Sequence, residues 1–139
     1  MPKHTITFHL DAPPERVFDY IADIRNEAEW SKDIRSVKLV GDGTIGQGTE
    51  FDTVYRGFGA MRLVHTECRR PERLVIEGDG PRIAMHFVMD LAPEGDGTSV
   101  TMTVDMRMRG AFRALNPVLN LGMPREMAKR PKQFAAVID

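Results

Sequence analysis

The sequence lacks the features that mark several large classes of protein. Cys68 is the only cysteine, so no internal disulfide can form. No run of residues approaches the roughly 18 consecutive apolar positions of a membrane-spanning helix. Residues 1–5 lead directly into an alternating pattern, without an apolar signal segment. We therefore expect a cytoplasmic protein without a membrane span.

A net charge is also almost absent. The chain carries 19 basic and 20 acidic residues, for a formal charge of −1. Because general nucleic-acid binders have a basic excess, no nucleic-acid partner is expected. The apolar fraction of 42% is too high for a disordered chain. A length of 139 residues favours a single domain, residues 1–139, with its own core.

Residues that mark metal sites and nucleophilic hydrolases are scarce. The four histidines lack zinc-binding spacing, and Cys68 has no cysteine partner. No Gly-x-Ser-x-Gly elbow surrounds a serine. Asp19, Asp23, Glu27 and Glu29 are spread around the first helical region, which is typical of a solvated face. We expect no metal, no cofactor and no catalytic pair of carboxylates.

Alternation of polar and apolar residues dominates the rest of the chain. Residues 5–10, and six further segments after residue 34, repeat with a period of two, which indicates strands with one buried face. The six segments are about 35–41, 48–56, 60–69, 73–78, 82–91 and 98–109. Gly-Asp-Gly triplets at 78–80 and 95–97 precede further strand patterns, so we interpret them as hairpin turns and not as phosphate loops.

Helices are expected in two places. Val17, Ile21 and Ile24 recur at helical spacing after the first strand, and a second short helix or turn covers residues 27–30. A longer helical segment closes the chain. This order predicts an α+β fold, in which a seven-stranded antiparallel sheet wraps around the C-terminal helix.

The C-terminal segment is interrupted by prolines. Leu115, Leu119, Met123 and Met127 recur every four residues, yet Pro117, Pro124 and Pro131 punctuate the same stretch. A proline inside a helix removes one hydrogen bond and costs roughly 3 kcal/mol. Pro117 suits a first helical turn after an Asn116 cap, and Pro131 is expected to bend or end the next piece. We predict a kinked or segmented cover that breaks near residues 120–124, where it would swing to admit a ligand.

The strand pattern also predicts which side chains point inward. The inward phase is clear in the third, sixth and seventh strands. In the segment 60–69 we favour Val64, Thr66 and Cys68 inward, with Arg62 near the strand end, because the opposite phase would bury His65 and Glu67. The inward set is rich in methionine, which indicates either simple packing or an adaptable cavity wall.

Several local motifs carry a family resemblance. They are Ala12-Pro13-Pro14-Glu15-Arg16-Val17-Phe18, Asp23, Trp30, Gly48-Thr49 and Arg70-Pro71-Glu72-Arg73-Leu74. With the order of elements, they make the chain resemble the START-related SRPBCC superfamily of helix-grip proteins, in its polyketide cyclase/dehydrase-like branch. The resemblance implies a deep cavity between sheet and C-terminal helix for a lipid, polyketide or similar apolar molecule.

The residues leave three functions open. The leading hypothesis is binding or transport of a small hydrophobic or aromatic ligand, by a monomer or homodimer. An alternative is a cyclase, aromatase or dehydratase that uses Tyr55 and Arg62 to polarise a carbonyl. Binding leads because no strong general base is visible inside. A third is a stress-response or protein-interaction adaptor that uses the outer sheet face or the basic helix end at Arg125, Lys129, Arg130 and Lys132.

The expected ligand site combines inward strand residues with the covering helix. Its predicted members are Trp30, Phe51, Thr53, Tyr55, Val64, Thr66, Met85, Phe87, Met102, Val104, Met106, Leu119 and Met123.

Overall fold

A computed structural model describes residues 3–139, and seven of its elements are strands. Every neighbouring pair is antiparallel, and the order across the sheet is β1-β7-β6-β5-β4-β3-β2. The strands are β1 (His4–Leu10), β2 (Ile34–Val40), β3 (Glu50–Tyr55), β4 (Gly59–Arg69), β5 (Arg73–Asp79), β6 (Ile83–Glu94) and β7 (Gly97–Met108). The predicted seven-stranded antiparallel sheet is confirmed.

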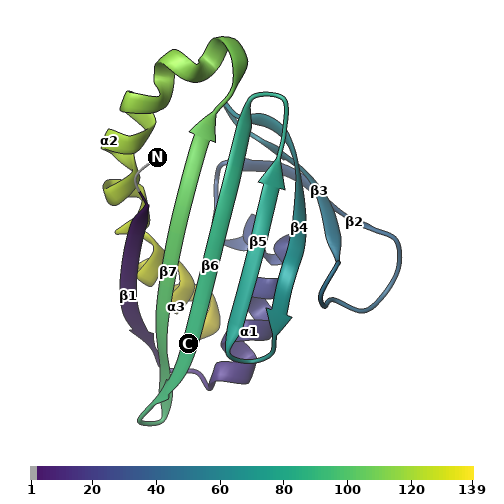
Figure 1. Cartoon of the computed structure of the whole chain (residues 1–139). Helices are drawn as coiled ribbons and strands as arrows, with labels where there is room; N and C mark the ends of the chain where they lie inside the picture. The colour runs from purple at the N-terminus through teal and green to yellow at the C-terminus, as the bar shows by residue number, and fades with distance from the viewer. Residues whose placement is uncertain (1–2) are drawn as a thin grey trace.

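The helical elements cover one face of this curved sheet (Figure 1). They are α1 (Pro14–Ala22), the 3₁₀ helices η1 (Ile24–Glu29) and η2 (Gly110–Leu115), α2 (Asn116–Met127) and α3 (Arg130–Ile138). α2 packs beside β1 and β7, and α3 packs against β1 and α1. The α+β architecture with a C-terminal helical cover agrees with the prediction.

The core lies between the sheet and these helices. Leu10, Val17 and Phe51 are fully buried there, and Ile138 closes the same core from the end of α3. α1 begins with Pro14 in its first turn, where the missing N–H costs nothing. The apolar face of α1 therefore reaches the sheet without a broken helical bond.

The predicted phase of β4 is wrong at its centre. Leu63 and His65 are buried, whereas Thr66 is exposed and Val64 lies on the outer face with Arg62. His65 is tolerated inside because its Nε2 lies 2.7 Å from the carbonyl oxygen of Ala22, at the end of α1. This bond lowers the cost of burying the imidazole, although its Nδ1 is buried without a hydrogen-bond partner among residues 3–139.

A bulge then restores the expected phase. The pairing of β4 with β5 shifts at Thr66, between His65 and Glu67. The extra residue returns Glu67 to the outer face, where it accepts a hydrogen bond from Arg69 Nε at 2.7 Å. Cys68 packs against the core as predicted. The inner face of β4 therefore buries His65 but not Glu67.

The C-terminal cover is segmented, but the predicted break near 120–124 is wrong. α2 continues through Gly122 and Pro124, and the chain breaks at residues 128–129 before α3. Met123 and Met127 explain this continuity, because an unbroken helix buries both. Burial of two methionines, at about 1.5–3 kcal/mol each, offsets the roughly 3 kcal/mol cost of an internal proline. The hypothesis of a gate at 120–124 loses its basis.

The other two prolines lie in first helical turns. Pro117 opens α2 as predicted, but Pro131 begins α3 and does not end a helix. Asn116 is not the helix cap. Its Oδ1 accepts a hydrogen bond from the backbone N–H of Met108 at 2.6 Å, which ties the start of α2 to the end of β7.

Candidate functional site

A cavity of about 460 Å³ lies between the inner face of the sheet and the helical cover. Its apolar lining comes from the central strands, from α1 and η1, and from α2 and α3. The apolar residues are Ile21, Ile24, Trp30, Phe58, Met61, Leu63, Ile76, Met85, Phe87, Met102, Val104, Met106, Val118, Leu119, Met123, Met127 and Phe134. The volume is in the range that holds a drug-sized molecule.

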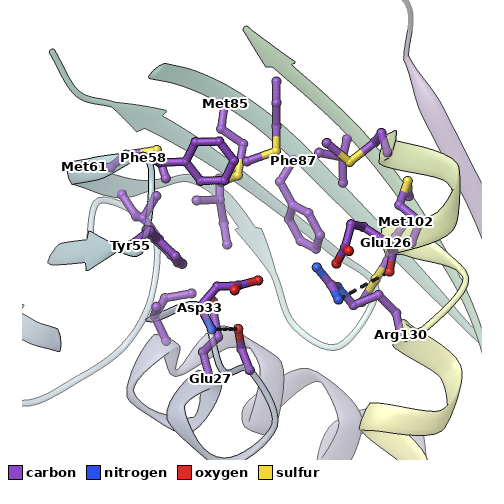
Figure 2. A pocket seen from close by; sticks show the side chains of 18 of the residues that line it. Glu27, Asp33, Tyr55, Phe58, Met61, Met85, Phe87, Met102, Glu126 and Arg130 are labelled. Carbon is purple, nitrogen blue, oxygen red and sulfur yellow. Dashed lines mark hydrogen bonds between the residues drawn. The ribbon is translucent and has the colours of Figure 1, made fainter. Parts of the chain in front are cut away.

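Charged and hydroxyl groups gather on the helical side of this cavity. Glu27 and Asp33 face Arg130 and Glu126 across it, while Tyr55 enters from the end of β3 (Figure 2). The methionine and phenylalanine side chains of the strands lie opposite these polar groups. The cavity thus has an apolar body and one polar end.

The short helix η1 places Glu27 in the cavity. A 3₁₀ helix has three residues per turn, so side chains three positions apart eclipse one another. Ile24, Glu27 and Trp30 follow this spacing, and all three line the cavity. The local backbone therefore aims one carboxylate at the same space as the only tryptophan of the chain.

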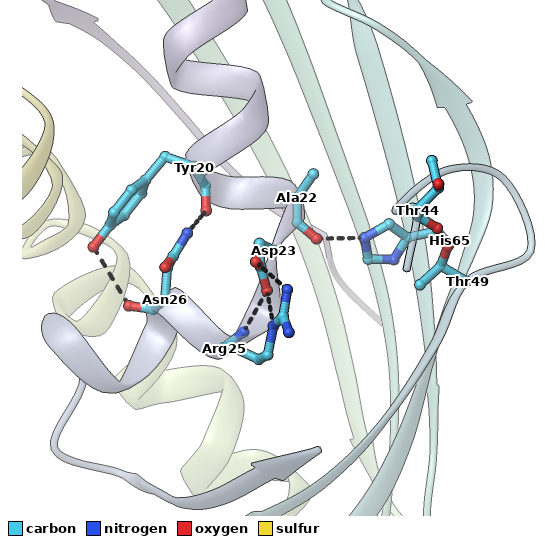
Figure 3. A network of polar contacts seen from close by, with 8 residues as sticks. All are labelled: Tyr20, Ala22, Asp23, Arg25, Asn26, Thr44, Thr49 and His65. Carbon is cyan, nitrogen blue, oxygen red and sulfur yellow. Dashed lines mark hydrogen bonds and ion pairs between the residues drawn. The ribbon is translucent and has the colours of Figure 1, made fainter. Parts of the chain in front are cut away.

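A polar network fixes the first half of η1 (Figure 3). Asp23 caps the helix by accepting a hydrogen bond from the backbone N–H of Arg25 at 3.1 Å, and its carboxylate holds the Arg25 side chain through two bonds of 2.8 Å. Asn26 donates to the backbone carbonyl of Tyr20 at 2.9 Å. With the bond from His65 to Ala22, these contacts hold η1 between α1 and the sheet.

The Glu27 carboxyl has an unusual acidity for its residue type. Burial raises its pKa from 4.5 to about 7, while the neighbouring Tyr55 phenol and the charge of Arg130 oppose the rise. The nearby charge of Asp33 raises it further. The carboxyl is therefore divided between its protonated and ionised forms near neutral pH.

Tyr55 is the matching proton donor. Burial raises the pKa of its phenol, and the charge of the neighbouring Glu27 carboxyl adds to the effect. The phenol is therefore protonated at neutral pH, and its O–H can donate a hydrogen bond to Glu27 or to an oxygen atom of a bound molecule.

Arg130 supplies the positive charge of the site. Its guanidinium lies 5.0 Å from the centre of the Trp30 ring and donates to Gln133 Oε1 at 2.8 Å. Burial lowers its pKa, and the charge of Glu27 opposes that change. The Trp30 ring in turn packs edge-on against Phe134 at 4.7 Å, so the cation is held between η1 and α3.

Nine of the predicted ligand-binding residues line the cavity. They are Trp30, Tyr55, Met85, Phe87, Met102, Val104, Met106, Leu119 and Met123. Phe51 and Thr53 are buried in the core beside it, and the Thr53 hydroxyl donates to the backbone carbonyl of Met61 at 2.7 Å. Val64 and Thr66 lie on the other face of the sheet, for the reason of strand phase given above.

Arg62, a predicted catalytic candidate, is also on the outer face. It forms two hydrogen bonds with Asp52, of 2.7 and 2.9 Å, and one of 3.2 Å with Glu50. Arg56 and Arg130 reach the cavity instead, and the more buried of the two is Arg130, which the sequence pattern places in an exposed basic helix end. The neighbouring residues Arg125 and Lys132 are exposed as predicted.

Sequence reasoning missed the polar end of the cavity. The charge pattern assigns Glu27 to a solvated face, although its spacing of three from Ile24 and Trp30 places it inward once η1 is recognised as a 3₁₀ helix. Phe58 escapes the strand pattern because it lies in a turn. Gly57 and Gly59 have φ of 84° and 76°, and this turn directs Phe58 into the cavity.

Two features are absent from the part of the chain that the structure describes. Within residues 3–139, no three His, Cys, Asp or Glu side chains are grouped so that they could bind a metal ion. No helix in the same range is long and apolar enough to cross a membrane.

Comparison with known proteins places this geometry in context. Residues 1–139 match the family model described as polyketide cyclase/dehydrase and lipid transport. No curated protein matches the chain. Three solved structures of similar fold illustrate how far the likeness extends.

A START superfamily protein from Mycobacterium smegmatis has a TM-score of 0.78 and 10% identity, over 98% of this chain and 96% of that one. TTHA0849 from Thermus thermophilus has a TM-score of 0.74 and 18% identity, over 97% and 95%. CV1439 from Chromobacterium violaceum has a TM-score of 0.67 and 21% identity, over 99% and 98%. Identities this low establish a shared fold only.

Proposed function

Because the chain belongs to the polyketide cyclase/dehydrase and lipid transport family of the START/SRPBCC superfamily, we propose that it binds a small, largely apolar or aromatic molecule in its cavity. The observation that carries the proposal is an apolar space of about 460 Å³ whose polar groups gather on its helical side. Such a site favours a ligand with an apolar body and a single oxygen-bearing end.

The polar end defines how that ligand would be oriented. The Tyr55 phenol would donate a hydrogen bond to a carbonyl or hydroxyl oxygen, and the Arg130 guanidinium would favour partial negative charge on the same group. Methionines from three strands, Met61, Met85 and Met102, would adapt to the shape of the apolar body. The site would therefore select for the polar group more strictly than for the carbon skeleton.

Blocking the cavity tests this proposal. Met85→Trp would fill it from β6, whereas Val88→Trp places the same side chain on the opposite face of the same strand. Binding of the fluorescent probe 1-anilinonaphthalene-8-sulfonate is expected to be lost in Met85→Trp and retained in Val88→Trp. Native mass spectrometry of the freshly purified wild-type protein would detect a co-purified small molecule. Equal probe binding by both folded variants would contradict the assignment of the cavity.

A second candidate function is acid–base catalysis on a carbonyl compound. The observation that favours it is the pairing of Glu27, whose pKa lies at about 7, with the protonated phenol of Tyr55 inside one apolar cavity. Ionised Glu27 would remove a proton next to a carbonyl, and the Tyr55 O–H would stabilise the enolate oxygen.

Proton exchange distinguishes this enzyme from a carrier. With β-tetralone in D₂O, an enzyme of this kind would accelerate deuterium incorporation next to the carbonyl. Glu27→Gln is expected to abolish the acceleration, and Tyr55→Phe would slow the exchange much more than it weakens binding. A wild-type exchange rate equal to that of buffer, with the ketone bound, would leave ligand binding as the function.

A further inference from the structure

Exposed apolar side chains are concentrated on one segment of the cover. Of the six large apolar residues that are exposed within residues 3–139, four lie in η2 and the first half of α2. Phe112 is 37% exposed, Leu115 49%, Val118 68% and Leu121 85%. We call these four residues the η2–α2 patch. An apolar cluster of this kind on a solvent-facing surface marks an interaction site.

Positive charge surrounds the η2–α2 patch. Residues 106–125, which begin just after the strand residue Asp105, contain four arginines and neither aspartate nor glutamate. The net charge of the whole chain is −1. The four arginines are Arg107, Arg109, Arg113 and Arg125. A fifth arginine, Arg82, places its guanidinium 5.2 Å from the centre of the Phe112 ring.

Most of this charge is not neutralised locally. Among the described residues 3–139, Arg82, Arg113 and Arg125 form no ion pair. Arg109 is paired with Asp79, and Arg107 lies 4.0 Å from Asp105. The surface around the patch is therefore basic as well as apolar.

The η2–α2 patch adjoins the cavity. Val118, Leu121 and Arg125 are spaced by three and four residues, so they lie on one flank of α2. Val118 belongs both to this exposed flank and to the cavity lining, and Leu119 and Met123 continue the lining on the inner side of the same helix. Figure 1 shows η2 and α2 together at one edge of the molecule, beside β1 and β7. The rim of the cavity and the patch are thus the two sides of one helix.

We propose that the η2–α2 patch docks on an anionic lipid bilayer. Leu115, Val118 and Leu121 would enter the interfacial region, and the surrounding arginines would contact lipid phosphates. Helices with apolar residues on one flank and arginines beside them are the kind that bind such surfaces. Docking would bring Val118 and the rim of the cavity to the bilayer, so that an apolar ligand could pass between them with little exposure to water; this consequence, but not the docking, rests on the proposed function.

The charge pattern favours a bilayer over a second copy of the chain. A symmetric dimer through the η2–α2 patch would bring the same arginines of both copies together, because such an interface uses one surface twice. An anionic membrane satisfies the apolar and the basic residues at once. Both occupants can be distinguished by experiment.

Vesicle flotation tests the proposal with the full chain. Wild-type protein is expected to float with phosphatidylcholine vesicles that contain about 30% phosphatidylglycerol, and to bind pure phosphatidylcholine at least about tenfold more weakly, since each arginine near an anionic surface adds affinity. Leu115→Ser/Leu121→Ser removes apolar residues outside the cavity lining, and Arg113→Gln/Arg125→Gln removes unpaired charge. Each pair of substitutions is expected to lower binding to anionic vesicles by about tenfold or more.

Two controls keep the result interpretable. Val40→Ser/Val54→Ser removes the other two exposed apolar residues, on β2 and β3, and is expected to float like the wild type. Probe binding in solution reports on the cavity separately, so a wild-type protein that binds the probe but does not float with anionic vesicles would overturn the docking and leave the proposed ligand binding intact. The membrane assignment would be refuted if the wild type did not float, or if it floated equally with both lipids. It would also be refuted by a concentration-dependent dimer that Leu115→Ser/Leu121→Ser abolishes.

Discussion

Replacement of Glu27 by glutamine is expected to stabilise the protein at alkaline pH and to have little effect at acidic pH. The folded pKa of Glu27 is about 7, against 4.5 for its ordinary value. The folded state therefore binds this proton more tightly than the unfolded state does. The corresponding stability is present below about pH 4.5 and is lost as the pH rises through about 7. The glutamine side chain does not titrate, so the variant escapes the loss.

The size of the effect follows from the shift. A difference of one pKa unit corresponds to about 1.4 kcal/mol. Most of the stability difference that results from the shift of the pKa from 4.5 to about 7 develops between about pH 5 and pH 8. The free energy of unfolding of Glu27→Gln, relative to the wild type, should therefore increase by roughly 2–3 kcal/mol over this interval.

Urea unfolding of ligand-free protein at four values between about pH 5 and pH 8 measures this difference. Trp30 is the only tryptophan and packs edge-on against Phe134 at 4.7 Å, so its fluorescence reports on the site as the protein unfolds. Glu72→Gln removes the same charge from an exposed position and should follow the wild type at every pH. A difference between Glu27→Gln and the wild type that stays constant across this range would refute the assignment of a buried, partly protonated carboxyl.

Three further outcomes are expected. His65→Leu should lower the free energy of unfolding by about 1–3 kcal/mol at about pH 8, because the buried carbonyl of Ala22 loses its partner. Burial lowers the pKa of His65, so wild-type stability should also fall below about pH 6.5 by a component that the variant lacks. Equal slopes of stability against pH for the two proteins would be incompatible with this. Gly122→Ala should increase the free energy of unfolding by about 0.5–1 kcal/mol and so raise the melting temperature, since a Cβ there meets no atom within 4 Å and α2 is continuous. Slower release of the fluorescent probe by this variant in stopped flow would instead indicate a hinge at this position. Tyr55→Phe should raise the pKa of Glu27 further, because the phenol that lowers it is removed. An unchanged midpoint in the pH titration of the Glu27 carboxyl by NMR would argue against this influence of Tyr55.

Much of the fold could be predicted because strand patterns are local. Alternation in β6 and β7 records which side chains face the core, and the turns between strands are short. The family motifs near α1 and Trp30 added the helix-grip arrangement. The same local information placed Tyr55, Met85 and Phe87 on the inner face, where they line the cavity.

Predictions failed where the environment of a polar residue decided its place. His65 reads as an outward residue until the carbonyl of Ala22 is brought to it from α1. Arg62 reads as a cavity residue until the phase of β4 pairs it with Asp52 on the outer face. Pro124 reads as a helix break until the burial of its neighbours in the helix is included.

The sequence by itself determined the number and direction of the strands, the helical cover and the apolar character of its inner face, because these depend on periodicity along one segment. Only the tertiary structure brought together Glu27 from η1, Tyr55 from β3 and Arg130 from α3. The pKa of a carboxyl depends on how much water and which charges surround it, and these neighbours come from segments far apart in the chain. The polar end of the cavity, and with it the chemistry available to a ligand, is therefore a property of the folded protein.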